Sequence, residues 1–130
     1  MSATHVSARL QPLALVGVGG FAGAVARHLV ALALPGAVPW GTLAANVLGS
    51  FALGVVLYEQ RFAGALSGET RLIVGTGFLS SFTTYSTFAA ETAGLAGGQA
   101  PVLAAANVAA NYGLGFAGVL CGRRVARWLS

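Results

Sequence analysis

The sequence predicts an all-α membrane protein with four transmembrane helices, the third of them broken. Three observations lead to this prediction: the composition, the spacing of the apolar segments, and a cluster of hydroxyl side chains in the third segment. The chain of 130 residues is 56% hydrophobic and only 8% charged, with a mean hydropathy of +0.78. A soluble domain carries about 25% charged residues, so this chain has too few charges to cover a water-exposed surface.

Four apolar segments each approach the length of about 20 residues that crosses a bilayer as a helix. They extend over about residues 13–34, 40–58, 72–95 and 101–119, and short connectors containing Pro or Gly separate them. We therefore expect residues 1–130 to form a single four-span domain. A cleaved signal peptide is the alternative for the first segment, but Arg27 and His28 interrupt its apolar run.

The charges predict an orientation in the membrane. The chain has seven Arg, no Lys and three Glu, and the arginines are not clustered with aromatics on one face, so we expect no nucleic-acid partner. With four spans, both termini and the connector of residues 59–71 share one side. That side carries Arg9, Arg61, Arg71, Arg123, Arg124 and Arg127, and the opposite side carries no arginine. By the positive-inside rule, both termini are expected in the cytoplasm.

Polar residues recur inside the second segment. Thr42, Asn46 and Ser50 are spaced by four residues, which places them on one face of a helix. Interhelical hydrogen bonding explains such a face, and so does a polar track, because the two N–H donors of Asn suit an anion. Arg27 is the one full positive charge within a span, and it has either a functional role or a position at the interface.

The third segment contains the stretch GFLSSFTTYSTF, in which seven of twelve residues carry a hydroxyl. Hydroxyls compete for backbone hydrogen bonds, so we expect the helix to be broken or unwound near Ser80 to Thr84. Unwound backbone frees carbonyl oxygens for a cation and helix ends for an anion. Tyr85 and Phe88 then share a face, and their positive ring edges can accommodate an anion; aromatic core packing is the alternative.

The inventory of polar groups within the spans favours donors. Hydroxyls, amides and one Arg are present, while Glu91 lies near the end of its span and suits a vestibule or a hydrogen bond. Asn107 and Asn111 form a further polar stripe in the fourth segment. This chemistry fits an anion better than a cation. The sequence offers no nucleophile–base pair, metal cluster or phosphate loop, so we expect that it is not an enzyme.

Several stretches of the sequence resemble a known protein family. The stretches GTLAANVLGSFALG (residues 41–54) and GTGFLSSFTTYSTFAAE (residues 75–91) are similar to the Fluc, or CrcB-type, fluoride channels, and GGFAGAVARH and GLGFAGVLCG match the family's first and last spans. The resemblance implies an antiparallel dual-pore dimer in the cell membrane. It also implies passive export of cytoplasmic fluoride, which relieves fluoride toxicity.

The resemblance also assigns site residues. It implies a fluoride pathway lined by Asn46, Thr42, Tyr85, Phe88, Ser86, Thr87 and Arg27. A structural sodium ion at the dimer centre is expected on the backbone carbonyls of Ser80 and Thr83, and oxygen ligands suit such a hard cation. The chain departs from the family pattern at Ser80-Ser81, where Gly-Gly is usual, at Tyr85, where Phe is usual, and at Asn107, where Tyr is usual.

Two alternatives remain beside the fluoride channel. A small four-span multidrug exporter would need a membrane-embedded carboxylate in its first span, and this chain has none there. A non-conducting partner subunit is the second alternative. The biased arginines predict one main orientation, so the antiparallel dimer forms either with a second copy of this chain or with an oppositely inserted homologue.

Overall fold

The computed structural model describes the backbone of residues 3–62 and 64–129, and the side chains of residues 10–59 and 64–129. The described residues form helices and no strand. Three helices are long: α1 (Ala3–Ala33), α2 (Trp40–Phe62) and α6 (Pro101–Trp128). Between α2 and α6 lie four short elements: α3 (Gly68–Arg71), the π-helix η1 (Leu72–Leu79), α4 (Ser80–Phe82) and α5 (Ser86–Gly97). The side chains of Arg9 and Arg61, used above to predict the orientation, lie outside the described part.

Three helices in the described part are long and apolar enough to cross a membrane: Leu10–Ala33, Trp40–Glu59 and Pro101–Trp128. They correspond to the first, second and fourth predicted spans, and each helix continues beyond the predicted limits. The third predicted span, residues 72–95, is divided among η1, α4 and α5. Multi-pass membrane character and a broken third segment are therefore confirmed.

The break lies at the end of the range that the sequence suggested. Ser80 and Ser81 are still helical, and the helix ends at Phe82, after which Thr83 adopts an extended conformation with φ −77° and ψ 154°. The predicted break near Ser80 to Thr84 is therefore confirmed at Thr83 and Thr84, while Ser80 to Phe82 remain helical. Thr83 Oγ1 donates to Leu79 O at 2.9 Å, which satisfies a carbonyl of the last turn before the break.

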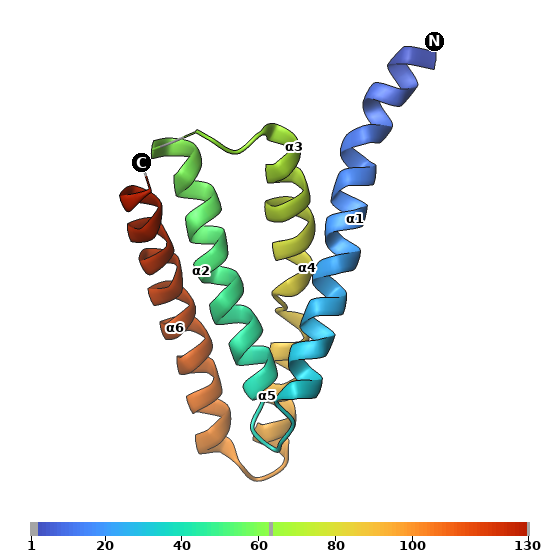
Figure 1. The fold of residues 1–130 in the computed structure, drawn as a ribbon. Coiled ribbons are helices and arrows are strands. Elements are labelled where there is room, and N and C mark those ends of the chain that lie inside the picture. Colours follow the sequence, from blue (N-terminus) through green and yellow to red (C-terminus); the bar gives the residue numbers. More distant parts are fainter. Residues whose placement is uncertain (1–2, 63, 130) are drawn as a thin grey trace.

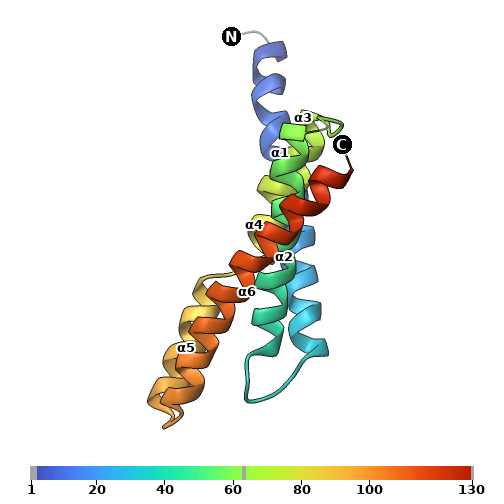
Figure 2. The same cartoon turned by 90° about the vertical axis from the view of Figure 1, so that its left-hand side faces the viewer.

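The helices pack in two pairs. α1 lies along η1 and α4, while α2 lies along α6, and α5 also packs on α6. Figure 1 shows the N-terminus, the C-terminus and α3 at the same end of the molecule. In Figure 2, α5 and the first half of α6 lie side by side and lean away from the lower ends of α1 and α2.

Glycine permits the close approach within both pairs. A Cβ atom built on Gly77 of η1 would lie 2.7 Å from Val16 O of α1, and one on Gly54 of α2 would lie 2.5 Å from Val119 O of α6. Real Cβ atoms do not occupy such positions, so these helices are in backbone contact, as small residues permit in membranes.

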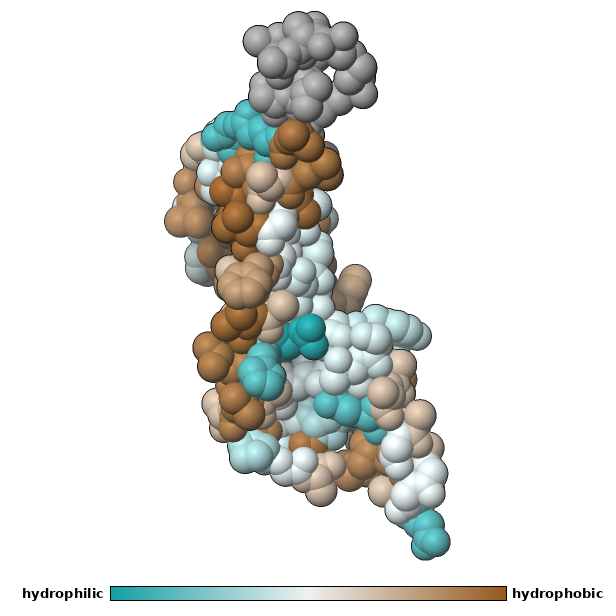
Figure 3. Space-filling view, turned by 90° about the vertical axis from the view of Figure 1, so that its right-hand side faces the viewer, coloured by the Kyte–Doolittle hydropathy of each residue, from teal (hydrophilic) through white to brown (hydrophobic). Residues whose placement is uncertain are grey.

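The outer surface is largely apolar. Among the described side chains of α1, seven large hydrophobic ones are exposed: Leu10, Leu13, Val18, Phe21, Val25, Leu29 and Leu32. Figure 3 shows hydrophobic residues over much of the length of the face on the α1 side. An apolar surface of this size suits hydrocarbon rather than water, in agreement with the membrane-spanning helices.

Candidate functional site

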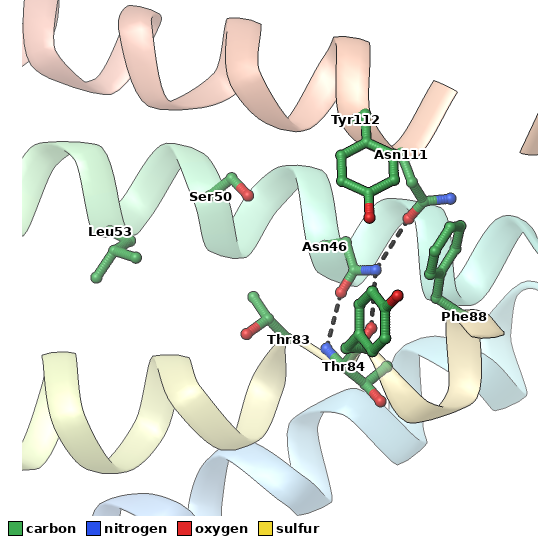
Figure 4. A pocket seen from close by; sticks show the side chains of 9 residues that line it. Asn46, Ser50, Leu53, Thr83, Thr84, Phe88, Asn111 and Tyr112 are labelled. Carbon is green, nitrogen blue, oxygen red and sulfur yellow. Dashed lines mark hydrogen bonds between the residues drawn. The ribbon is translucent and has the colours of Figure 1, made fainter. Parts of the chain in front are cut away.

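A polar cavity of about 280 Å³ lies beside the break. Its lining comes from α2, from the break itself, from α5 and from α6: Asn46, Ser50, Leu53, Thr83, Thr84, Tyr85, Phe88, Asn111 and Tyr112. Figure 4 shows these side chains, with Leu53 at the end of the cavity opposite Phe88. Three of the predicted pathway residues, Asn46, Tyr85 and Phe88, meet here.

Asn46 holds the break in place. Thr84 N–H donates to Asn46 Oδ1 at 2.8 Å, and Asn46 Nδ2 donates to Thr84 O at 3.1 Å. The side-chain amide thus replaces the helical partners that the broken segment lacks, which satisfies the rule that backbone polar groups at membrane depth need a protein partner. Gly49 lies one turn further along α2. A Cβ atom on it would collide with Thr83 Cγ2, so the absence of a side chain lets the broken segment fit closely against α2.

The amide of Asn46 continues into a chain of hydrogen bonds on α6. Asn46 Nδ2 also donates to Asn111 Oδ1 at 2.9 Å, and Asn111 Nδ2 donates to Asn107 Oδ1 at 3.0 Å. Asn107 Nδ2 then donates to Thr92 Oγ1 at 2.9 Å, and Thr92 Oγ1 donates to Phe88 O at 2.7 Å. Each amide both donates and accepts, so the network has one defined direction and fixes the orientation of all three Asn side chains.

Three aromatic rings border the cavity. The Tyr85 and Phe88 ring centroids are 5.8 Å apart at an interplanar angle of 54°, and the Phe88 and Tyr112 centroids are 6.0 Å apart at 88°. Phe88 is only 6% exposed, whereas Tyr85 is 71% exposed. The perpendicular pair of Phe88 and Tyr112 is the edge-to-face arrangement that aromatic quadrupoles favour. Phe88 therefore forms a buried wall of the cavity, and the exposed Tyr85 lies at its rim.

The remaining predicted pathway residues lie near the break but outside this cavity. Thr42 is buried and donates to Glu91 Oε1 at 2.9 Å. Arg27 Nε donates to Ser81 O at 3.1 Å, a carbonyl of the last turn before the break. Ser86 and Thr87 begin α5, where Thr84 Oγ1 accepts the Thr87 N–H at 3.2 Å and caps the helix. Their place in a conduction pathway stays a prediction.

The two carbonyls predicted to hold a cation have lost their helical donors. In a continuous α-helix Ser80 O would accept from Thr84 N–H, and Thr83 O from Thr87 N–H. Here Thr84 N–H donates to Asn46 and Thr87 N–H donates to Thr84 Oγ1. Among the described residues no cluster of His, Cys, Asp or Glu could hold a metal.

Three residues of the cavity, Thr84, Asn111 and Tyr112, were not among the pathway residues predicted from the sequence. The i, i+4 spacing of Asn107 and Asn111 did reveal a polar stripe. The stripe alone could not show which helix it meets, because that depends on how α6 packs against α2 and α5.

These features define a multi-pass membrane protein with an aromatic and amide-lined polar cavity at a helix break, rather than a soluble enzyme. A sequence profile of the family described as "CrcB-like protein, Camphor Resistance (CrcB)" matches residues 14–123. The chain belongs to this family, which confirms the resemblance to the CrcB-type channels.

Several curated relatives are similar over nearly their whole length. The chain is 57% identical to "Fluoride-specific ion channel FluC 1" of Natronomonas pharaonis over 91% of this chain and 96% of the relative. It is 54% identical to "Fluoride-specific ion channel FluC 1" of Haloarcula marismortui over 98% and 94%. It is also 57% identical to "Fluoride-specific ion channel FluC 2" of Halobacterium salinarum over 87% and 84%. These relatives are channels, in agreement with the prediction that the chain is not an enzyme.

Proposed function

We propose that this chain forms a fluoride-selective ion channel that exports cytoplasmic fluoride passively and so relieves fluoride toxicity. The observation that carries the proposal is the pairing of Asn46 with Thr84, which holds an amide donor beside the ring of Phe88 in a cavity at the helix break. The names of relatives at 54–57% identity support fluoride as the ion.

The chemistry of the cavity suits a small, strongly hydrated anion. Such an anion gives up water only where donors replace it at close range. Asn46 Nδ2 donates to Thr84 O and to Asn111 Oδ1, so an anion would take over one of these two hydrogen bonds as it passes. The edges of Phe88 and Tyr85 would supply positive ring hydrogens. Thr42, Ser86, Thr87 and Arg27 are proposed to contribute to the same pathway on either side of the break.

The architecture proposed is an antiparallel dual-pore dimer of four-span subunits. The third crossing would consist of η1, α4 and α5 in series. The position of both termini and α3 at one end of the molecule supports an even number of crossings (Figure 1). The arginines of that end favour cytoplasmic termini in the cell membrane. The partner would be a second copy of this chain or an oppositely inserted homologue.

A structural sodium ion is proposed at the dimer centre. The carbonyls of Ser80 and Thr83 would hold it, because the hydrogen bonds of Asn46 and Thr84 leave both oxygens without their helical donors. When bound, the ion would supply a positive charge, and four carbonyl oxygens, two from each subunit, would coordinate it. Ser in place of Gly at residue 80 leaves the carbonyl chemistry unchanged.

Fluoride efflux from liposomes tests the proposal. Purified protein should dissipate a fluoride gradient without any proton gradient, and chloride should be largely excluded. Flux that requires a proton gradient would support a multidrug-type exporter instead, although the described first span contains no carboxylate. Absence of flux from this chain alone, with flux restored by a paired homologue, would identify a non-conducting partner subunit.

A further inference from the structure

A second cavity, here called the outer cavity, lies between α2 and the start of the broken segment. It has a volume of about 430 Å³ and is lined by Leu53, Val56, Leu57, Arg71, Gly75, Thr76 and Ser80. Among the described side chains, Arg71 is the charged residue of this lining. Arg71 ends α3, and α3 lies at the end of the molecule that also carries both termini (Figure 1).

The carboxylate that pairs with Arg71 belongs to Glu59, which is not among the residues that line the outer cavity. Glu59 Oε2 lies 3.6 Å from Arg71 Nη2, while Glu59 Oε1 accepts the N–H groups of Ala65 at 2.5 Å and Leu66 at 3.2 Å. Glu59 is 7% exposed and does not line the cavity. The backbone of the connector satisfies Glu59 Oε1, whereas Glu59 Oε2 makes no hydrogen bond among the described residues and meets Arg71 across a long ion pair.

Polar side chains line the cavity wall. Arg71 is one of them, and its Nε is buried behind the surface without a hydrogen-bond partner among the described residues. Thr76 and Ser80 lie four residues apart, and both are exposed. The hydroxyl of Ser80 makes one long hydrogen bond, to Gly75 O at 3.4 Å. Gly75 and Thr76 of η1 and Ser80 at the start of α4 line the same cavity.

The outer cavity adjoins the polar cavity at the break. Leu53 lines both of them, and Figure 4 shows it at the end of the polar cavity away from Phe88. A small anion leaving the Arg71 end would therefore pass one apolar side chain before it meets Ser50 and Asn46. A hydrophobic step between two polar sites is a common way to limit passage through a pore.

We propose that the outer cavity is a second anion site, in which Arg71, Thr76 and Ser80 hold a small monovalent anion before it crosses Leu53 to the polar cavity. This proposal rests on the proposed function for the identity of the anion. Arg71 supplies the charge that concentrates the anion, and the two hydroxyls supply donors that replace part of its water.

The concentration dependence of fluoride flux tests the site. In Arg71→Gln we expect the fluoride concentration for half-maximal flux to rise about tenfold, because local charge raises anion concentration and association rates by about that factor or more. Maximal flux and selectivity over chloride should stay unchanged, and Arg71→Lys should restore most of the affinity. Arg124→Gln, at an exposed arginine of α6 outside the cavity, is the matched control and should behave like the native chain.

Loss of Arg71 also leaves Glu59 without its cation, so a second variant separates folding from binding. Glu59→Gln/Arg71→Gln removes both charges of the pair and leaves the net local charge as in the native chain, so that the guanidinium donors alone are lost. The half-maximal concentration should still rise, by less than in Arg71→Gln. A native half-maximal concentration in this double variant, or a fall in maximal flux alone, would overturn the proposal.

A measurement independent of fluoride completes the test. In a Cys121→Ser background, Thr76→Cys is treated with an anionic and with a cationic methanethiosulfonate reagent. We expect the anionic reagent to react faster, and Arg71→Gln to lower the anionic-to-cationic rate ratio about tenfold. An unchanged ratio, or no reaction with either reagent, would refute the outer site even in a conducting channel. An Arg71-dependent ratio in a chain that passes no fluoride would refute the proposed function instead and leave the anion site standing.

Discussion

The side chain of Asn46 and the backbone of Thr84 hold each other by two hydrogen bonds, at 2.8 and 3.1 Å, across the interface of α2 and the broken segment. Asn46 thereby satisfies both the N–H and the C=O of Thr84, which lies outside any helix. The same pairing withdraws Thr84 N–H from Ser80 O. The pathway amide and the proposed sodium ligand are thus linked through Thr84.

Asn46→Ala should abolish fluoride flux. It leaves Thr84 N–H and C=O unpaired at a cost of about 1–3 kcal/mol, so the protein should also unfold at a lower temperature. Asn46→Asp retains the acceptor for Thr84 N–H but places a carboxylate in the anion pathway. Fluoride electrode recordings from liposomes should show flux lost in both variants, and both should be destabilised, because the second carboxylate oxygen of Asn46→Asp would face the acceptors Thr84 O and Asn111 Oδ1. Normal conduction in either variant would remove Asn46 from the pathway.

Phe88→Ile should also abolish flux while leaving the dimer assembled. The substitution removes the ring that meets Tyr112 edge-on, and a change of shape at a buried site costs about 1 kcal/mol in stability. Phe116→Ile is the control, because Phe116 is 68% exposed on α6. Efflux and size-exclusion profiles should separate the two variants; comparable flux in both would mean that Phe88 is a packing residue only.

Gly54→Ala should destabilise the protein, whereas Gly113→Ala should not. A Cβ on Gly54 would lie 2.5 Å from Val119 O, while one on Gly113 meets nothing within 4 Å. Overpacking of a close contact costs about 1–3 kcal/mol, and Ala in place of an exposed helical Gly gains up to about 1 kcal/mol. Thermal unfolding in detergent checks the difference, and equal unfolding temperatures would contradict direct contact of α2 and α6.

Removal of sodium should lower the stability of the assembled channel. A ligand at 100 times its dissociation constant stabilises the folded state by about 2.7 kcal/mol. The unfolding temperature should therefore rise with sodium concentration and respond much less to potassium, at constant ionic strength. An unfolding temperature that is the same in sodium and in N-methylglucamine would exclude a sodium site at Ser80 and Thr83.

The chain should insert mainly with its termini in the cytoplasm. Arg123, Arg124 and Arg127 lie within the last helix at the end that carries both termini, and arginines near span ends set the orientation. A compartment-sensitive reporter on the C-terminus should give signal from the cytoplasmic side. Replacing these three arginines by Ala should produce mixed orientations. Comparable signal from both sides in the unmodified chain would instead favour a homodimer formed by dual insertion.

The sequence by itself determined the membrane class, the helical segments and the approximate position of the break. In hydrocarbon, an apolar segment of about 20 residues satisfies its own backbone hydrogen bonds by forming a helix. Composition and segment length were therefore sufficient to predict the membrane-spanning helices. The hydroxyl cluster predicted a broken third segment because hydroxyls compete with helical hydrogen bonds. The family motifs predicted Asn46, Tyr85 and Phe88, and the structure brings these three together.

Only the tertiary structure decided which polar groups meet. The break begins at Thr83 rather than Ser80 because Asn46 of α2 captures Thr84, 38 residues away in the sequence. Likewise Thr42 meets Glu91, and Asn111 meets Asn46, through the packing of separate helices. Helical periodicity predicts the face of the helix on which a side chain lies. Which other helix contacts that face depends on the close backbone contacts that glycines permit between helices. The partners of these polar residues therefore follow from the close packing of α1 with η1 and of α2 with α6.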